Sequence, residues 1–306
     1  MNWEKGLLIG GIFAVVIGGI IFAVIKFTGN GLTADAKRKR KIRFKKKDGT
    51  SSFTATEFSA GNEKVIDVPA MDASINANEL QKSQMKLGLA TITTTYGTYI
   101  NNIAALTNVK AEILKSFIYV ESRGKATATS SCCYGLMQIS PISAGESLRN
   151  ENSYGRLSAG EKAIVEKYLP KVNYAKPVIT GTDLLNPELN ILLGAIIIGQ
   201  LMDDPKNTED RVVEVKTAGT AWGDVSTKDS GKLPVSTQSK AEVKTEKVLR
   251  LDHVIVLYNT GIGAYNAGRP KGDATAVCKA RGENGINCKY IKSILGTDGT
   301  LDILVP

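Results

Sequence analysis

Histidine and cysteine are scarce in this chain. It has one histidine, His253, and four cysteines among 306 residues. So few nitrogen and sulfur ligands exclude most zinc sites, and they exclude any serine–histidine–aspartate machinery that does not use His253. Apolar residues are not scarce, because 42% of the chain is hydrophobic and 23% is charged. This composition is typical of a folded protein and excludes a wholly disordered or collagen-like chain.

The net charge of +9 is concentrated in one short segment. Residues 33–50 contain nine Lys or Arg and two Asp, a local charge of +7, so the rest of the chain carries only +2. The centre of this segment, residues 37–47, reads KRKRKIRFKKK. Such a run either stops transfer of the chain through a membrane and stays solvated, or it binds anionic lipid or nucleic acid.

An uninterrupted apolar run precedes the basic segment. Residues 6–25 contain no polar side chain, and as a helix they would span ~30 Å, the thickness of the bilayer hydrocarbon. Trp3 and Lys5 before the run, and Lys26 and Phe27 after it, are typical interface anchors. A cleaved signal peptide would have a shorter apolar region with a cleavage site close behind it. We therefore predict a single transmembrane helix that is retained and contacts the lipid bilayer.

Changes in composition divide the chain into four predicted parts. These are a transmembrane anchor at 1–28, a basic juxtamembrane segment at 29–50, a linker at 51–88 and a helical domain at 89–306. The domain contains a polar insertion at about 203–247, for which we expect a solvated loop, with a lid or a docking surface as alternatives.

Glu121 lies at the end of a predicted amphipathic helix. We expect this helix to begin near Asn108 as its N-cap. Its apolar side chains recur at intervals of three and four residues, at Ile113, Leu114, Phe117, Ile118 and Val120. Glu121 falls at the edge of this stripe, where apolar neighbours disfavour the ionised carboxylate and raise its pKa. This is the environment of a general acid that works near neutral pH.

Four segments, in this order, resemble motifs of the lytic transglycosylases and goose-type lysozymes. They are YVESRGKATATSSCCYGLMQISP at 119–141, NPELNILLGAIIIGQLM at 186–202, GIGAYNAG at 261–268 and KYIKSIL at 289–295. The resemblance implies a mostly α, lysozyme-like domain with a saccharide groove. It also implies cleavage of the β-1,4 bond between N-acetylmuramic acid and N-acetylglucosamine in peptidoglycan, with no metal or organic cofactor.

The resemblance implies a single catalytic carboxylate, Glu121. Most glycosidases use two carboxylates, but the next acids along the chain, Glu146 and Asp183, match no second catalytic position of the family. Glu121 would first protonate the leaving oxygen and then accept a proton from the 6-hydroxyl of the sugar. The product would be a 1,6-anhydro ring, and the acetamido group of the substrate would stabilise the intermediate positive charge.

Other site residues follow from the same resemblance. It implies that Ser122 orients Glu121 and that Gln138 contacts the sugar beside the scissile bond. Tyr290 would complete the wall of the cleft, although a purely structural role is equally open.

The family's Tyr-Asn pair has two candidates in this chain. Tyr265 and Asn266 match the motif and would position the acetamido group, with a structural role for Tyr265 left open. Tyr258 lies two helical turns earlier and would share a face with Tyr265. The residue pattern favours Tyr265, whereas the preceding apolar run fits Tyr258.

The cysteines are typical of an oxidising compartment. Cys132 and Cys133 are neighbours, and Cys278 and Cys288 lie just before Tyr290. Because adjacent cysteines rarely pair, we expect a Cys278–Cys288 disulfide, or two bridges that join the two regions. The spacings are not those of zinc ribbons.

Two other functions are possible, and the side of the membrane on which the domain lies is undecided. A lysozyme-type hydrolase would use water as the nucleophile, and a structural membrane protein of a virion or secretion machine would only bind glycan. The positive-inside rule places the basic segment and all that follows it in the cytoplasm, away from peptidoglycan. The internal membrane of a bacteriophage particle would resolve this conflict. A specialised lysis or conjugation system of the bacterial envelope is the cellular alternative.

Overall fold

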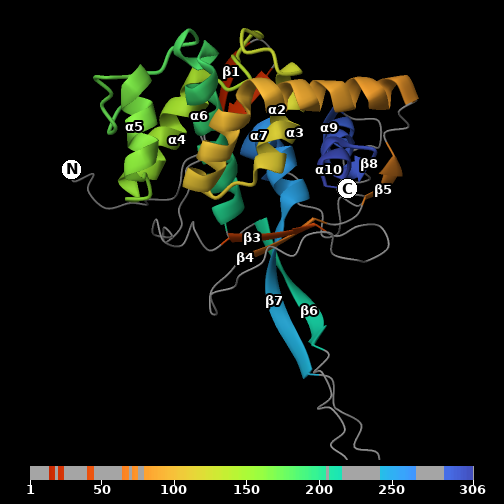
Figure 1. Ribbon diagram of the computed structural model, residues 1–306. Coiled ribbons are helices and arrows are strands. Elements are labelled where there is room, and N and C mark those ends of the chain that lie inside the picture. The colour runs from red at the N-terminus through yellow and green to blue at the C-terminus, as the bar shows by residue number, and fades with distance from the viewer. Residues whose placement is uncertain are drawn as a thin grey trace, which may run out of the picture.

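The described part of the chain is mostly helical, as expected. The structure is a computed structural model that describes residues 14–17, 20–23, 40–44, 64–68, 71–74, 79–204, 207–215, 242–266 and 286–305. Its helices are α2 (Glu79–Thr107), α3 (Ala111–Ser122), α4 (Pro141–Ser153), α5 (Ala159–Tyr168), the 3-10 turn η1 (Asp183–Leu185), α6 (Pro187–Asp203), α7 (Leu251–Asn266), α9 (Ile286–Leu295) and α10 (Thr300–Leu304). In Figure 1, α2 runs along the top of the helical domain, with α4 and α5 at one end and α9 and α10 at the other.

Helix α6 forms the centre of the hydrophobic core. It contacts α2, α4, α5 and α7, and nearly all of its side chains after the first turn are buried. A helix that is apolar all round is stable in water only when other helices surround it. Its start follows the predicted pattern, because the side chain of Asn186 accepts a hydrogen bond from the backbone N–H of Leu189 at 3.2 Å and Pro187 occupies the first turn.

Helix α3 begins two residues later than we predicted from an N-cap at Asn108. Lys110 is the N-cap residue, and Asn108 has a φ of 56° in the turn between α2 and α3. The expectation that Asn108 caps the helix was therefore wrong. The reason is that α2 continues to Thr107, and asparagine is one of the few residues that adopts the left-handed conformation needed to reverse the chain directly afterwards.

The predicted polar insertion contains a β-hairpin instead of a solvated loop alone. β6 (Thr208–Val215) pairs antiparallel with β7 (Glu242–Arg250), and residues 216–241 lie outside the described residues. The hairpin projects away from the helices in Figure 1, and β7 runs directly into α7. β6 reads TEDRVVEV, and its three valines are β-branched residues that favour the extended conformation.

Two segments from the first part of the chain extend the sheet of this hairpin. β3 (Arg40–Phe44) pairs parallel with β4 (Lys64–Val68), and β4 pairs parallel with β7, so the strand order is β3-β4-β7-β6. β3 belongs to the predicted basic segment and β4 to the predicted linker. A further strand of that linker, β5 (Met71–Ser74), pairs parallel with β8 (Gly296–Thr297).

The helical domain begins before the predicted boundary at residue 89. Helix α2 starts at Glu79, and its first turns bury Met85 and Leu89. The Ser, Thr and Asn content of this segment indicated a linker, but Met85 and Leu89 bury an apolar edge against the core, and this burial stabilises the helix.

The predicted transmembrane segment carries two short strands in the structure. β1 (Ala14–Ile17) pairs antiparallel with β2 (Ile20–Ala23), and the rest of residues 6–25 lies outside the described residues. Val and Ile around a Gly-Gly pair favour such a hairpin. Within the described residues, no helix combines the length and the apolar character needed to cross a bilayer. The transmembrane helix stays a prediction.

Candidate active site

Helix α3 places Glu121 at the edge of the core. Most of the predicted apolar stripe is buried, with Ile113, Leu114, Phe117 and Ile118 fully inaccessible, whereas Val120 is half-buried. Glu121 lies in the last turn and is half-buried, so its carboxyl group meets both core and solvent. The chain then reverses through two left-handed residues, Arg123 with φ 56° and Gly124 with φ 80°.

Tyr290 of α9 holds the carboxyl group of Glu121. Its hydroxyl donates a hydrogen bond of 2.5 Å to Oε1 of Glu121. Burial raises the pKa of Glu121 to about 7, and the hydrogen bond from Tyr290 acts in the opposite direction because it stabilises the carboxylate. A carboxyl group with this pKa exchanges its proton readily near neutral pH, as both a general acid and a general base must.

Tyr258 of α7 is a second tyrosine at this site. Its hydroxyl donates a hydrogen bond of 2.8 Å to the backbone oxygen of Met137. Its ring packs edge-on against Phe117, with 4.7 Å between the ring centroids and an interplanar angle of 72°. Burial, and then the negative charge of Glu121, raise the pKa of the Tyr258 hydroxyl. Tyr258 is therefore fastened to the turn that contains Met137 and lies within electrostatic range of Glu121.

The turn at 135–138 has a backbone that other residues could not easily adopt. Gly135 has a φ of 79°, and a Cβ atom there would collide with the backbone oxygen of Leu184 and with the side chain of Asn190. Gln138 also has a positive φ, of 45°. Close packing of this turn against Leu184 and Asn190, together with the positive φ, therefore requires glycine at position 135.

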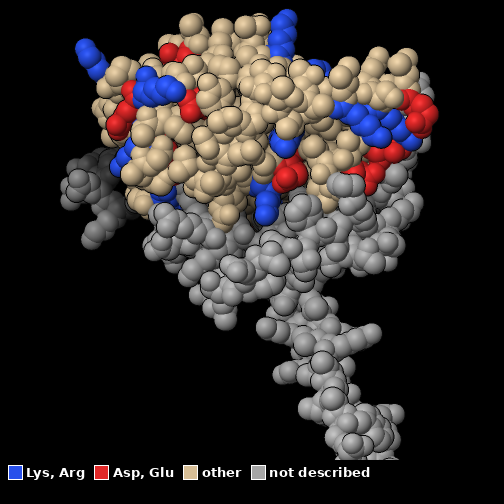
Figure 2. Space-filling model, viewed as in Figure 1, with Lys and Arg blue, Asp and Glu red and all other residues tan. Residues whose placement is uncertain are grey.

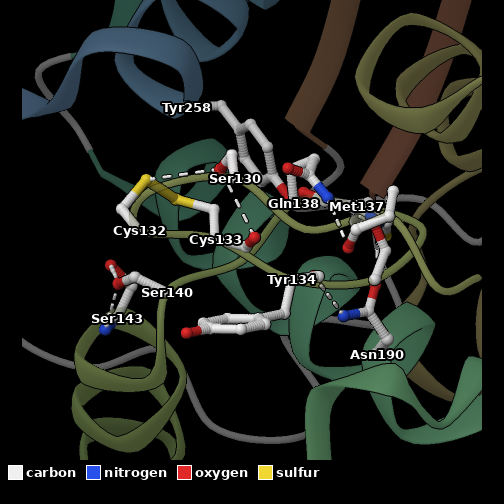
Figure 3. Close-up of a disulfide and its surroundings, with 12 residues drawn as sticks. Ser130, Cys132, Cys133, Tyr134, Met137, Gln138, Ser140, Ser143, Asn190 and Tyr258 are labelled. Carbon is white, nitrogen blue, oxygen red and sulfur yellow. Dashed lines mark hydrogen bonds between the residues drawn. A yellow bond between two sulfur atoms is a disulfide. The ribbon is translucent and has the colours of Figure 1, made fainter. Parts of the chain in front are cut away.

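Asn190 of α6 fastens this turn to the core. Its Oδ1 accepts from the backbone N–H of Met137 at 2.8 Å, and its Nδ2 donates to the backbone oxygens of Tyr134 at 2.9 Å and Leu184 at 2.8 Å. Figure 3 shows the Asn190 side chain beneath the turn. The sequence matched Asn190 to a motif without indicating its role, although a lone amide within an apolar helix is a signal of a specific buried hydrogen bond.

Gln138 lies beside Tyr258 in Figure 3. Its Nε2 donates to the backbone oxygens of Gly135 at 2.9 Å and Ala128 at 3.1 Å. These bonds fix the direction of the side-chain amide. Its Oε1 accepts no hydrogen bond from a described residue, so this oxygen can accept one from a substrate hydroxyl or amide.

Ser122 does not orient Glu121 in the way that we expected. Its hydroxyl donates to the backbone oxygen of Ile118 at 3.1 Å and accepts from the backbone N–H of Gly124 at 3.2 Å. The side chains of consecutive helical residues point about 100° apart, so those of Glu121 and Ser122 have different directions. The Ser122 hydroxyl bonds to the backbone at the end of α3. The group that positions Glu121 is the hydroxyl of Tyr290.

The structure describes only the backbone of the other Tyr-Asn pair. Tyr265 and Asn266 lie in the last turn of α7, and their side chains are outside the described residues. Tyr258, two turns earlier on the same helix, is the tyrosine that the structure brings to Glu121. The preference for Tyr265 stays a prediction.

The cysteine pairing differs from the expectation. Cys132 and Cys133 form a disulfide with each other, with their Cα atoms 3.7 Å apart, the separation that one peptide unit imposes. This pairing rules out the alternative of two bridges between the two cysteine regions. Cys288 is also disulfide-bonded and fully buried, whereas Cys278 lies outside the described residues, so the Cys278–Cys288 bridge stays a prediction.

The described residues offer no group of His, Cys, Asp or Glu side chains that could hold a metal ion. Comparisons with known proteins found no family model, no curated protein and no solved structure that matches this chain.

Proposed function

We propose that the helical domain is a lysozyme-like lytic transglycosylase that cleaves the β-1,4 bond between N-acetylmuramic acid and N-acetylglucosamine in peptidoglycan. The observation that carries the proposal is the carboxyl group of Glu121, whose pKa burial raises to about 7 and which accepts a hydrogen bond from Tyr290. The motif resemblance supplies the substrate class, and the site geometry supports acid–base chemistry at one residue.

Glu121 serves as the acid in the first step and as the base in the second. The protonated carboxyl group gives its proton to the glycosidic oxygen as the bond to the anomeric carbon breaks. The carboxylate that forms is stabilised by the hydroxyl of Tyr290. It then accepts the proton of the 6-hydroxyl as that oxygen attacks the anomeric carbon and closes the 1,6-anhydro ring, which returns Glu121 to its protonated form.

The motif resemblance, in which no second acid of this chain matches a catalytic position, favours a single-acid mechanism over hydrolysis. Retaining and inverting hydrolases place a second carboxylate within about 5–10 Å of the first. Among the described residues, no other acid contributes to the pKa shift of Glu121, which has burial and Tyr290 as its causes. The acetamido group of the substrate would stabilise the positive charge in place of a second carboxylate.

The remaining substrate contacts are assigned by position. The free Oε1 of Gln138 accepts a hydrogen bond from the sugar beside the scissile bond, and Tyr258 forms the adjoining wall. Tyr265 and Asn266 keep the role that the motif implies, which is to position the acetamido group.

Product analysis tests the function. The full chain, as wild type and as Glu121→Gln, is incubated with purified peptidoglycan, and the released muropeptides are identified by mass. We expect anhydro-muropeptides from the wild type only. Glu112→Gln is the matched control, because Glu112 lies in the first turn of the same helix, and it should cleave like the wild type. Reducing ends instead of anhydro ends would identify a hydrolase. Binding without cleavage by the wild type would identify a glycan-binding structural protein.

We further propose that residues 6–25 anchor this domain in a membrane, of a phage particle or of the bacterial envelope, and that the basic segment 37–47 binds anionic lipid or nucleic acid. The support is the uninterrupted apolar run and the local charge of +7. Protease treatment of intact particles or cells tests the location. Digestion of the domain from outside an intact bacterium would contradict a virion interior.

A further inference from the structure

The Cys132–Cys133 disulfide has no evident role as a stabilising cross-link. A disulfide stabilises a protein mainly by restricting the unfolded chain, and the effect grows with the length of the loop that it closes. A bridge between neighbours closes a loop of two residues, so it restricts the unfolded chain very little. Another property of the paired sulfurs must therefore account for their presence in this loop.

The loop that carries the disulfide is fastened to the candidate active site. The backbone N–H of Ser130 donates to the backbone oxygen of Cys133 at 2.9 Å, which closes the tip of the loop. Further along, the backbone oxygen of Ala128 accepts from the backbone N–H of Gly135 at 2.8 Å and from Nε2 of Gln138 at 3.1 Å. The disulfide therefore has a defined position relative to the turn that carries Gln138.

The disulfide lies on the same side of this loop as Tyr258. Figure 3 shows both of them above the loop, whereas Tyr134 and Asn190 lie below it, toward α6. Tyr258 contacts the turn through its hydrogen bond to Met137. The disulfide and Tyr258 thus lie on the side of the loop opposite to Tyr134 and Asn190 in this view.

The chemistry of this surface suits an uncharged, ring-shaped ligand. Both cysteines are half-buried, so part of the disulfide is accessible to a ligand. Residues 126–145, which include the loop, contain no charged residue. On the face of the molecule seen in Figure 2, charged side chains gather at the two ends and at the lower centre, and uncharged residues cover most of the remaining surface. Paired sulfur atoms are apolar and polarizable, and they pack well against the C–H face of a sugar ring.

We propose that the Cys132–Cys133 disulfide is part of the substrate-binding surface, where its sulfur atoms contact the C–H face of a sugar ring in the bound glycan. The inference rests on the proposed function, because the glycan must lie beside Glu121 for this contact to form. It assigns to the disulfide a role in binding that a cross-link alone would not have.

Selective isotope labelling tests the contact directly. The full chain carrying Glu121→Gln, which cannot cleave, is labelled with ¹³C-cysteine and ¹³C-tyrosine and titrated with the β-1,4-linked tetramer of N-acetylglucosamine. We expect nuclear Overhauser effects between β-protons of Cys132 or Cys133 and ring protons of the sugar. With only four cysteines in the chain, the signals are assigned from Cys132→Ser and Cys133→Ser variants.

A second measurement compares affinities. In the Glu121→Gln background, the double substitution Cys132→Ser/Cys133→Ser should weaken tetramer binding about tenfold. Thr129→Ala, an exposed position of the same loop, is the matched control and should leave the affinity unchanged. Thermal unfolding of each variant verifies that the fold is intact.

The outcomes separate this inference from the proposed function. If the tetramer perturbs Tyr258 and Tyr290 but gives no Overhauser effect to Cys132 or Cys133, the disulfide contact is wrong while the function stands. If the tetramer perturbs none of these residues and the wild type leaves peptidoglycan intact, both proposals are overturned.

Discussion

The hydroxyl of Tyr290 donates a 2.5 Å hydrogen bond to the carboxyl group of Glu121, although 169 residues separate the two in the sequence. Two effects act in opposite directions on the pKa of Glu121 at this contact. Burial at the end of α3 favours the neutral acid, and the tyrosine hydroxyl favours the carboxylate. Their balance, a pKa of about 7, allows one residue to give and accept a proton within a catalytic cycle.

Cleavage should lose rate as the pH rises above about 7. The first step needs the protonated form of Glu121, and that fraction falls about tenfold per pH unit above the pKa. The release of anhydro-muropeptides, measured between pH 5 and pH 9, checks this. A rate that stays constant or rises from pH 7 to pH 9 would contradict the assignment of Glu121 as the acid.

Removal of the Tyr290 hydroxyl should move this alkaline limit to higher pH. In Tyr290→Phe the carboxylate loses its hydrogen bond, so the pKa of Glu121 rises above about 7. The rate at the optimum should also fall, because the carboxyl group is no longer held in place. The pH profile of kcat/KM measures both effects.

Tyr258→Phe is the matched control for this experiment. The hydroxyl of Tyr258 bonds to the backbone oxygen of Met137 and not to Glu121, so its removal should lower the rate without a comparable shift of the pH limit. A shift of the Tyr290→Phe limit toward lower pH would contradict the role given to its hydrogen bond.

Glu121 should make the wild-type protein less stable at high pH. The pKa of this group is about 7 in the folded state against 4.5 for a solvated glutamate, so the folded state binds the proton more tightly. The stability that this group contributes is therefore complete below pH 4.5 and is lost as the pH rises through 7. Relative to Glu121→Gln, the wild type should lose on the order of 3 kcal/mol of unfolding free energy between pH 4.5 and pH 8. Urea unfolding of both proteins across this range provides the measurement, and parallel curves would refute the raised pKa.

Two asparagines near the start of α6 should differ strongly in their response to the same substitution. In Asn190→Asp, a carboxylate oxygen replaces the amide donor that faces the backbone oxygens of Tyr134 and Leu184. A buried charge would then lie against two acceptors, which should lower the unfolding free energy by roughly 3 kcal/mol or more. Cleavage should fall as well, because Asn190 holds the turn that carries Gln138.

Asn186→Asp is the control for Asn190→Asp. As the N-cap of α6, Asn186 only accepts a hydrogen bond, and a carboxylate accepts it equally well beside the positive end of the helix. Its stability should change by less than about 0.5 kcal/mol. Chemical denaturation of both variants checks the contrast, which would fail if Asn186→Asp were the more damaging change.

The parts of the site that could be predicted from the sequence depend on local patterns. The apolar spacing from Ile113 to Ile118 identified the buried face of α3 and the position of Glu121 at its end. Burial of a carboxyl group at such an edge was sufficient to predict the direction of its pKa shift. Pro187 after Asn186 marked the start of α6 for equally local reasons.

Composition was a weaker guide in the polar segments. The insertion at 203–247 contains the β6–β7 hairpin, and α2 begins within the predicted linker. A strand is stabilised by a partner, and the first turns of α2 are stabilised by the core beneath them. The composition of a segment indicates neither its partner strand nor the core residues on which it packs.

The sequence by itself determined the position of Glu121 at the end of a helix, the buried face of that helix and the start of the apolar helix α6, because periodic burial and helix capping act over a few residues. Only the tertiary structure decided which groups surround Glu121. In that structure Glu121 accepts a hydrogen bond from Tyr290 and not from Ser122. Tyr258 bonds to the turn that contains Met137, and Cys132 pairs with Cys133. The two hydrogen bonds form because helix packing brings together residues that are far apart in the sequence. The disulfide depends on the backbone conformation of one loop. A local sequence pattern predicts neither the packing nor this conformation.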